Sequence, residues 1–339
     1  MRKPTLKDVA GEAGVSIGMV SRVLNNYGSF SQETKNKVLD AAKKLAYRRN
    51  ATARALKIKH THAIGVLVSD FVSFFWSTLV RGIEQVANRA GYHIILCNTN
   101  ENAQKGKEYF GTLLERNIDG LIVSPVQGTQ TEIKRLSRGG LPMVLVDRGI
   151  RGLKVPCVTV DNEAGSFEAV DYLIKLGHRR IGIVSGIRGI MTSEDRLAGY
   201  VRAFTENGIS IDEKLIVEGE FVSDKTHSAA LKLLGMENPP TAIFVCNEPM
   251  TIGVLLALRE KRIRVPDEMS LIGFDDPIWA SITQPALTAV SQPSYSMGVL
   301  ACEALIGQIK ERDQLRISTE SIVLKPKLVV RESCRKLKA

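Results

Sequence analysis

Short apolar runs alternate with amphipathic stretches along most of this 339-residue chain, and this alternation limits the possible folds more than any other feature. Continuous apolar runs are typical of strands buried on both faces, and apolar residues spaced by about 3.6 positions are typical of helices. The pattern starts at about Ala63 and restarts near Ile181, which predicts two successive α/β units with parallel, doubly wound sheets. The expected strands are residues 64–68, 94–97, 121–123, 143–146, 181–184, 215–217, 242–245 and 271–274, and the expected helices lie near residues 74–91, 103–117, 131–138, 163–177, 195–207, 225–235 and 249–261.

The basic residues are concentrated at one end of the chain. The formal net charge is +10, and residues 1–60 hold 13 Lys and Arg against 4 Asp and Glu, whereas residues 61–339 hold 33 against 32. A positive charge confined to one short segment favours a polyanionic partner, and nucleic acid is the leading candidate. The first residues lack the apolar core of an export signal and no long apolar run is present, so we expect a cytoplasmic protein without a membrane segment.

The basic end carries signals for three short helices. Thr5 and Asp8 form a capping-box pattern at the start of the first helix, which is expected to end at Gly14. Ser16 is placed to cap a second helix and Ser31 a third. The third helix is expected to bury one apolar stripe made of Val38, Leu39, Ala42 and Leu45.

Two short helices joined by a tight turn have the geometry of a helix-turn-helix, in which the second helix enters the major groove of DNA. Arg22 is the strongest candidate for reading a base, because its forked guanidinium can pair with O6 and N7 of guanine. Ile17 can contact a thymine methyl group, whereas Gly18 can offer only its backbone. A structural helical hairpin with a solvated Arg22 is the alternative, and the concentrated positive charge favours DNA binding over it.

Several segments of this chain closely resemble the lactose/galactose repressor (LacI/GalR) family. In the basic end these are residues 5–10 (TLKDVA), 14–16 (GVS), 20–25 (VSRVLN) and 50–56 (NATARAL). The resemblance continues at residues 119–122 (DGLI), 177–182 (GHRRIG), 196–200 (RLAGY), 265–267 (VPD) and 273–276 (GFDD). Their common order and spacing make the resemblance specific over nearly the whole chain.

The resemblance implies a homodimer that binds a pseudo-palindromic operator in double-stranded DNA, with linker segments folded as hinge helices in the minor groove. Leu56 matches the family's apolar wedge, which is inserted at a flexible base step, and a plain linker leucine is the alternative. Arg48 and Arg49 are expected to add phosphate contacts, which strengthen binding without reading sequence. The residues expected at DNA are Thr5, Ser16, Ile17, Gly18, Ser21, Arg22, Asn25, Arg48, Arg49, Asn50, Ala53, Leu56 and Lys57.

The chain also departs from the family pattern. Met19 stands where Thr is common, and residues 46–49 (AYRR) replace the usual Gly-Tyr-x-Pro. Residues 247–249 (NEP) stand where the family commonly has Asn-Asp without the proline. The identities of the operator and of the effector are therefore not carried over from the family.

Ligand sites in open α/β sheets lie beyond the carboxyl ends of the strands, so polar and aromatic residues just after the apolar runs are the pocket candidates. Carboxylate, guanidinium and amide groups can bind the hydroxyls of a polyhydroxylated ring, and aromatic side chains can cover its CH face. A small sugar fits this set, and the resemblance implies that matching positions line the family's effector cleft. The candidate effector residues are Asp70, Phe74, Phe75, Asp147, Arg148, Arg196, Phe221, Asn247, Asp275 and Gln292.

Each of these residues also has a purely structural interpretation. Asp275 can cap a turn, Arg196 can form a surface ion pair, and Phe221 can belong to a core.

Other classes of protein are also compatible with parts of this pattern. A secreted sugar-binding protein would share the large domain but not the basic headpiece. An enzyme is disfavoured because no catalytic, cofactor or metal-binding motif is present, so we expect no cofactor, no catalytic residue and no metal. A regulator controlled by a protein co-repressor, as in catabolite control, stays open beside the sugar-responsive repressor.

The domain organisation follows from these patterns. We expect an all-α helix-turn-helix headpiece over residues 1–49, a hinge or linker over 50–62 and an effector-binding and dimerisation domain over 63–339. The large domain is expected to be periplasmic-binding-protein-like, with an N-subdomain of about 63–161 plus 293–323 and a C-subdomain of about 162–292 plus 324–339. The cysteines, expected to be reduced and mostly buried, are Cys97, Cys157, Cys246, Cys302 and Cys334.

Overall fold

The computed structural model describes residues 4–24, 27–47, 61–311 and 320–337. It divides into two compact units, Met1–Thr61 and His62–Ala339. The first unit contains the headpiece helices, and the second contains the α/β sheets. No helix in the described part of the chain is long and apolar enough to cross a membrane.

The headpiece consists of three helices around a small core. Thr5 accepts a hydrogen bond from the backbone of Asp8, whose carboxylate accepts one in return, so the expected capping box is present. Gly14 ends the first helix in the left-handed conformation, which glycine adopts without strain. The helices are α1 (Leu6–Ala13), α2 (Ile17–Leu24) and α3 (Gln32–Lys44).

The predicted apolar stripe of α3 is partly wrong. Val38 is buried as expected, but Leu39 is 45% exposed and Ala41 is buried instead. Successive helix residues are rotated by about 100°, so Leu39 points away from the face that Val38 and Ala41 share. The caps of the helices are as predicted, because Ser16 accepts from the backbone of Met19 and Ser31 from that of Thr34.

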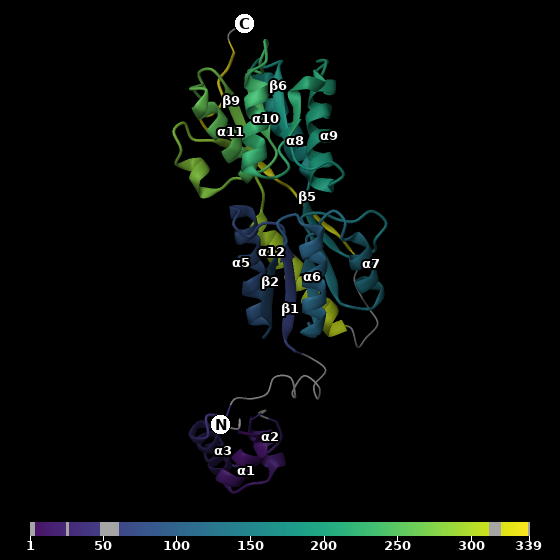
Figure 1. The fold of residues 1–339 in the computed structure, drawn as a ribbon, viewed down its shortest axis with the longest axis vertical. Coiled ribbons are helices and arrows are strands. Elements are labelled where there is room, and N and C mark those ends of the chain that lie inside the picture. The colour runs from purple at the N-terminus through teal and green to yellow at the C-terminus, as the bar shows by residue number, and fades with distance from the viewer. Residues whose placement is uncertain (1–3, 25–26, 48–60, 312–319, 338–339) are drawn as a thin grey trace. The chain divides into compact units, whose positions relative to one another are not determined.

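The second unit contains two lobes, each with a sheet between layers of helices (Figure 1). Lobe 1 has the sheet order β11-β5-β4-β3-β1-β2, and all of its described strand pairs are parallel. Helices α5 and α12 pack on one face of this sheet, and α6 and α7 pack on the other. The elements are β1 (Ala63–Val68), α5 (Phe74–Arg89), β2 (His93–Asn98), α6 (Ala103–Glu115), β3 (Gly120–Val123), α7 (Gln130–Arg138), β4 (Met143–Val146), β5 (Cys157–Val160), α12 (Ser294–Glu311) and β11 (Ile322–Leu324).

Lobe 2 has the sheet order β12-β10-β9-β8-β6-β7. Its described strand pairs are parallel except that β12 is antiparallel to β10 at the sheet edge. Helices α8 and α9 pack together, as do α10 and α11 (Figure 1). The elements are α8 (Asn162–Lys175), β6 (Ile181–Ser185), α9 (Met191–Glu206), η1 (Glu213–Leu215), β7 (Ile216–Glu218), α10 (Ser223–Leu234), β8 (Ala242–Val245), α11 (Glu248–Glu260), β9 (Ser270–Phe274), η2 (Ile278–Ser281), β10 (Thr288–Ser291) and β12 (Lys327–Val329).

The predicted α/β architecture with two parallel sheets is confirmed, with corrections at particular elements. The strand predicted at 215–217 begins one residue later, because Leu215 ends a short 3₁₀ turn and is buried there. Strand β11 runs through Leu324, so the proposed subdomain limit between residues 323 and 324 falls inside a strand. The described cysteines are free thiols, and Cys334 is the one that is not fully buried.

The chain passes between the lobes three times among the described elements. It leaves lobe 1 after β5, returns after β10 to form α12, and crosses again between β11 and β12. These crossings bring the carboxyl ends of both parallel sheets to face each other. The space between the lobes is therefore lined by the loops that follow the strands, where α/β proteins bind ligands.

Candidate functional site: an effector cavity and a headpiece helix

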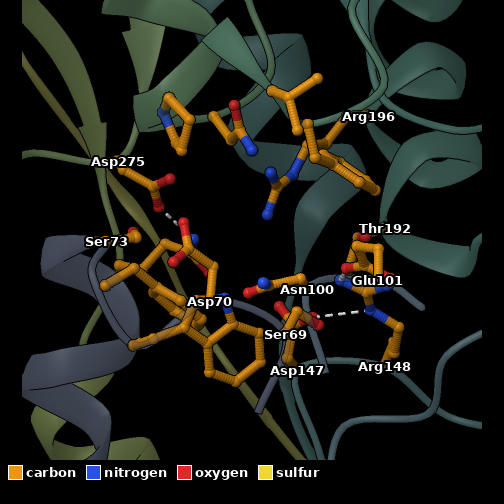
Figure 2. A pocket seen from close by; sticks show the side chains of 17 residues that line it. Ser69, Asp70, Ser73, Asn100, Glu101, Asp147, Arg148, Thr192, Arg196 and Asp275 are labelled. Carbon is orange, nitrogen blue, oxygen red and sulfur yellow. Dashed lines mark hydrogen bonds and ion pairs between the residues drawn. The ribbon is translucent and has the colours of Figure 1, made fainter. Parts of the chain in front are cut away.

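A cavity of about 320 Å³ lies between the two lobes. This volume is at the lower end of the roughly 300–1,000 Å³ found for small-molecule sites. Ser69, Asp147 and Asp275 each directly follow a strand, so the strand ends place their side chains in the cavity. Figure 2 shows Arg196 and Asp275 on the side of lobe 2, opposite Asp70 and Asp147 on the side of lobe 1.

Nine of the ten candidate effector residues line this one cavity. They are Asp70, Phe75, Asp147, Arg148, Arg196, Phe221, Asn247, Asp275 and Gln292.

Phe74 lies outside the cavity that the other nine candidates share. It is the first residue of α5 and lines a separate pocket beside Tyr295. Its helical neighbours Phe75 and Trp76 line the cavity instead, because each helix position is rotated by about 100° from the one before. The aromatic wall predicted for lobe 1 is therefore made by Phe75 and Trp76.

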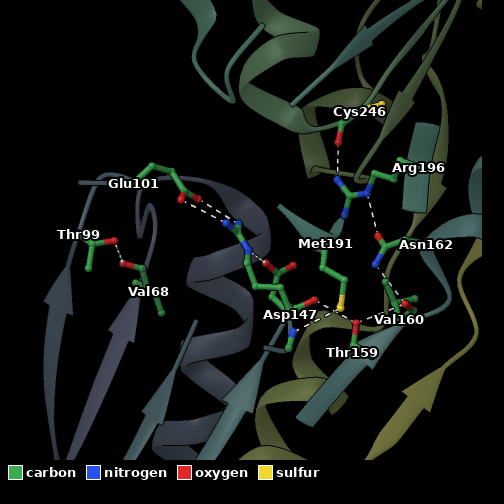
Figure 3. A network of polar contacts seen from close by, with 12 residues as sticks. Val68, Thr99, Glu101, Asp147, Thr159, Val160, Asn162, Met191, Arg196 and Cys246 are labelled. Carbon is green, nitrogen blue, oxygen red and sulfur yellow. Dashed lines mark hydrogen bonds and ion pairs between the residues drawn. The ribbon is translucent and has the colours of Figure 1, made fainter. Parts of the chain in front are cut away.

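Arg196 is held by hydrogen bonds within lobe 2. Its Nε donates to Asn162 Oδ1 at 2.8 Å, and its Nη1 donates to the carbonyl of Cys246 (Figure 3). The guanidinium also lies 3.8 Å from the centre of the Phe274 ring. The alternative interpretation of Arg196 as part of a surface ion pair is not supported, because Arg196 is 4% exposed and no ion pair of it is among the described contacts.

Arg148 is the second buried guanidinium at the cavity, and two carboxylates neutralise it. Its Nε donates to Asp147 Oδ2 at 2.9 Å, and its two Nη atoms contact Glu101 at 3.0 and 3.2 Å (Figure 3). Glu101 and Asp147 together raise the pKa of Arg148, against the effect of burial. Phe221 of lobe 2 lies over this guanidinium, with 5.5 Å between Cζ and the ring centre.

Asp275 is buried and has two hydrogen-bond donors. Gln292 Nε2 donates to Oδ1 at 2.6 Å, and the backbone N–H of Glu248 donates to Oδ2 at 3.0 Å. Burial raises the pKa of Asp275 to about 6, although Arg196 acts in the opposite direction. The carboxyl group thus stands close to its own titration point at neutral pH.

Two polar atoms at the cavity are buried without a hydrogen-bond partner among the described residues. They are Ser69 Oγ and Gln292 Oε1. Buried polar groups in native proteins are nearly always paired, so such atoms beside a cavity are suited to a polar ligand.

Asn247 has a structural role as well as a place in the cavity. It is the N-cap of α11, and its Oδ1 accepts from the backbone N–H of Met250 at 2.9 Å. The side-chain carbonyl is therefore used by the helix, and the Nδ2 amide group is the part suited to a ligand.

Left-handed backbone conformations gather around the cavity. A positive φ at a residue other than glycine is uncommon, and such strain is found most often at functional sites. Five residues that line the cavity have this conformation: Asn100, Glu101, Asp147, Phe221 and Asp275.

Sequence reasoning missed part of the cavity lining. Asn100 and Glu101 follow β2, so the same strand-end rule that found Asp147 could have found them. Thr192 and Val222 lie near the starts of helices, where the sequence carries no distinctive signal. The missed lining residues are Ser69, Ser73, Trp76, Asn100, Glu101, Thr192, Val222 and Pro249.

The second headpiece helix presents the predicted DNA-reading face. Val20 and Val23 of α2 are buried in the headpiece core. Ile17 is 47% exposed, Gly18 and Arg22 are also exposed, and Ser21 is partly exposed. Helix positions 17, 18, 21 and 22 lie on one side, which is the arrangement that a recognition helix needs.

Two other DNA-contact candidates are helix caps, and the remaining candidates lie outside the residues that the structure describes. Thr5 and Ser16 cap α1 and α2, respectively, so both have local hydrogen bonds as well as exposure. Tyr27 is 74% exposed and was not among the candidates, although it lies soon after α2. The candidates outside the described residues are Asn25, Arg48, Arg49, Asn50, Ala53, Leu56 and Lys57.

Two family models match this chain. The model of bacterial regulatory proteins, lacI family, matches residues 5–50, which include all three headpiece helices. The model of a periplasmic binding protein-like domain matches residues 170–334.

Similar proteins match over both units. Catabolite control protein A of Priestia megaterium is 36% identical over 302 residues, which cover 89% of this chain and 91% of that protein. The lac repressor dimer bound to operator and the anti-inducer ONPF is 26% identical with a TM-score of 0.85, covering 98% of this chain and 100% of that chain. The complex of the transcriptional regulator CelR with cellobiose is 29% identical with a TM-score of 0.72 over the same shares of the chains. This chain belongs to the lacI family of bacterial regulatory proteins and is a DNA-binding transcriptional regulator.

Proposed function

We propose that this protein is a cytoplasmic repressor of carbohydrate-metabolism genes that binds a pseudo-palindromic operator as a homodimer. An unphosphorylated sugar bound in the cavity between the lobes controls its affinity for DNA. The observation that carries this proposal is the set of side chains in the cavity, where carboxylates, guanidinium groups and amides surround a space bounded by aromatic rings.

The charges of the cavity favour a ligand without a phosphate. Among the described lining residues, four carry carboxylates and two carry guanidinium groups. Arg148 is already neutralised by Asp147 and Glu101, and Arg196 is engaged by Asn162 and a carbonyl. A phosphate would have to enter a site whose carboxylates repel it and whose cations are occupied.

The hydroxyl groups of a sugar have partners on both lobes. Asp275 and Arg196 are presented by lobe 2, and Asp70 and Asp147 by lobe 1 (Figure 2). The rings of Phe75, Trp76 and Phe221 are available for the CH face of the ligand. The solved complex of the CelR regulator with cellobiose, a similar protein, supports a sugar as the effector.

The proposed DNA interface is the exposed face of α2. Ile17, Gly18, Ser21 and Arg22 would meet base edges in the major groove, and the excess positive charge of residues 1–60 would provide phosphate contacts. The dimeric state and the operator follow the lac repressor, whose structure was solved as a dimer bound to operator.

A thermal-shift screen of the full-length protein tests the effector class. We expect an unphosphorylated mono- or disaccharide to raise the melting temperature, because a ligand at 100 times its Kd adds about 2.7 kcal/mol of stability. The 6-phosphate of the same sugar should give no shift. Asp275→Ala should remove the response, while Glu237→Ala, an exposed carboxylate in the same lobe, should keep it.

The result that contradicts the proposal is a stabilising sugar phosphate together with unresponsive free sugars. A DNA affinity that changes only when a second protein is added would favour control by a protein co-repressor instead.

A further inference from the structure

Glu248 makes hydrogen bonds across the space between the lobes. It is the first residue of α11 in lobe 2, and its side chain is buried, with 7% exposed. Its Oε2 accepts from Ser73 Oγ at 2.9 Å and from the backbone N–H of Phe74 at 2.7 Å, both in lobe 1. A carboxylate of one lobe is therefore bound at the start of a helix in the other.

Helix α5 is otherwise without a side-chain cap. Ser73 occupies the N-cap position, but its hydroxyl makes no capping bond to its own helix, and the first turn of α5 contains no acidic residue. The first backbone N–H groups of a helix have no partner within the helix and carry a partial positive charge. Glu248 supplies both the missing acceptor and the complementary negative charge from lobe 2.

Glu248 is also fixed on its own side. Trp279 Nε1 donates to its second carboxylate oxygen, Oε1, at 3.0 Å. The backbone N–H of Glu248 donates to Asp275 Oδ2 at 3.0 Å, so the same residue is joined to a carboxylate that lines the cavity. A continuous set of hydrogen bonds thus runs from Asp275 through Glu248 to the first turn of α5.

We propose that Glu248 is a positioning residue that holds the two lobes in the arrangement seen here by capping α5 from the opposite lobe. The start of α5 carries Ser73, Phe75 and Trp76, which line the cavity. Through this cap, Glu248 sets where the aromatic wall of lobe 1 stands relative to Asp275. The cap is made by protein groups alone, so this role does not depend on the effector proposed above.

The tryptophans of the chain make this role measurable. The sequence contains two, Trp76 and Trp279, and both lie at this contact or in the adjoining cavity. Trp279→Phe leaves Trp76 as the single tryptophan of the full-length protein. It removes the bond from Trp279 to Glu248 Oε1 but keeps both bonds that Oε2 accepts from lobe 1. Trp76 is 6% exposed and lies in the first turn of α5, so its quenching reports the solvent exposure of that turn.

The experiment is acrylamide quenching of Trp76 fluorescence in the Trp279→Phe protein. We expect Glu248→Ala to raise the quenching constant at least about twofold, because an uncapped and released first turn opens locally to solvent. Glu248→Asp keeps the charge but draws the carboxylate back by one methylene, and it should behave like Glu248→Ala. Glu248→Gln keeps an acceptor for Phe74 N–H and should give a smaller increase.

Two variants are matched controls. Ser77→Ala removes a hydroxyl of the same helix whose bond, among the described residues, is to the carbonyl of Phe74, and Glu237→Ala removes an exposed carboxylate of lobe 2. Both should leave the quenching constant unchanged, and circular dichroism should show that every variant is folded. If Glu248→Ala does not fold, the quenching constant of Glu248→Asp is the deciding measurement. The proposal is overturned if the folded Glu248 variants quench like the parent, or if the controls increase quenching equally.

Discussion

At the scale of single residues, the site combines a carboxyl group near its titration point with cations that are already paired. Asp275 is desolvated by burial and lies beside the backbone of Glu248. Arg148 and Arg196 are held by protein acceptors, so neither has to move to become ordered when a ligand binds. Such preorganised groups favour a ligand whose hydroxyls fit the existing geometry.

The raised pKa of Asp275 predicts a pH-dependent effect of Asp275→Asn on stability. The folded protein binds the proton of Asp275 more tightly than the unfolded chain, whose pKa is near 3.8. The stability from this protonation is therefore fully present below about pH 3.8 and is lost as the pH rises through about 6. The Asn variant has no such loss, and its gain relative to the wild type should grow between about pH 4 and pH 6 and level off above about pH 7, at no more than about 3 kcal/mol.

Urea unfolding at several pH values measures this difference. A gap between the two proteins that stays constant from about pH 4 to pH 7 would show that the pKa of Asp275 is not raised by folding. Asp275→Asn should also abolish the sugar response at neutral pH, because an amide cannot reproduce both acceptor positions.

Arg22 is predicted to read a base in each half-site. Arg22→Ala should cost about 1–3 kcal/mol per headpiece and relax the preference at one base pair, because it removes a bidentate guanine contact. Lys43→Ala, which removes an exposed cation from α3, should leave the preferred sequence unchanged. Selection from a randomised-site library compares the two variants, and identical sequence preferences would rule out the role of Arg22.

At the scale of elements, helices α5 and α12 approach each other closely at two glycines. A Cβ atom at Gly298 would lie 2.0 Å from the carbonyl oxygen of Leu79, and one at Gly82 would lie 2.3 Å from that of Tyr295. These are backbone atoms, so the helices would have to separate to admit a methyl group. The two glycines therefore set how closely α5 and α12 approach.

Gly298→Ala is predicted to lower the free energy of unfolding by at least about 2 kcal/mol, because the helix pair must shift. Gly307→Ala, on the same helix with no atom within 4 Å of the added Cβ, is the control. It should raise stability by about 0.5–1 kcal/mol, since alanine loses less backbone entropy. Denaturant unfolding measures the free energy of unfolding of both variants. Equal changes in Gly298→Ala and Gly307→Ala would contradict the close approach of α5 and α12.

The sequence predicted most of the buried strands, but it missed β5 and β10, which are short and largely buried, as well as β11, β12 and α12. Buried strands such as β4 and β8 were found with their observed bounds. Strands β11 and β12 have three residues each and none fully buried, so neither shows a run that periodicity can detect. Helix α12 was also missed, because it is apolar on several sides and lacks a single clear stripe.

The cavity was predictable where residues follow strands and not where they come from helix starts. Asp147 and Asp275 were found by the strand-end rule, and Glu101 was open to it. Trp76 and Thr192 lie in the first turns of α5 and α9. Whether a side chain in such a turn faces the cavity depends on how the helix is rotated and how the lobes pack. The contact of Glu248 with Ser73 joins residues 175 positions apart, and no local pattern encodes it.

At the scale of the whole α/β unit, the three crossings allow the lobes to reorient about a few strand-connecting segments. Ligand groups bound to Arg196 and Asp275 on one side and to Asp147 on the other would favour one orientation. If that orientation also governs DNA binding, linkage requires that DNA and ligand change each other's affinity by the same factor. The typical size of such coupling is about 1–3 kcal/mol, which is roughly 5- to 150-fold.

The coupling between effector and operator is measured by calorimetric titration of the sugar identified by thermal shift, with and without a saturating operator duplex from the library selection. We predict that operator changes the Kd of the sugar by roughly 5- to 150-fold, and that the sugar changes the Kd of the operator by the same factor. A sugar that binds the full-length protein with the same Kd in both titrations would show that the cavity does not control DNA binding.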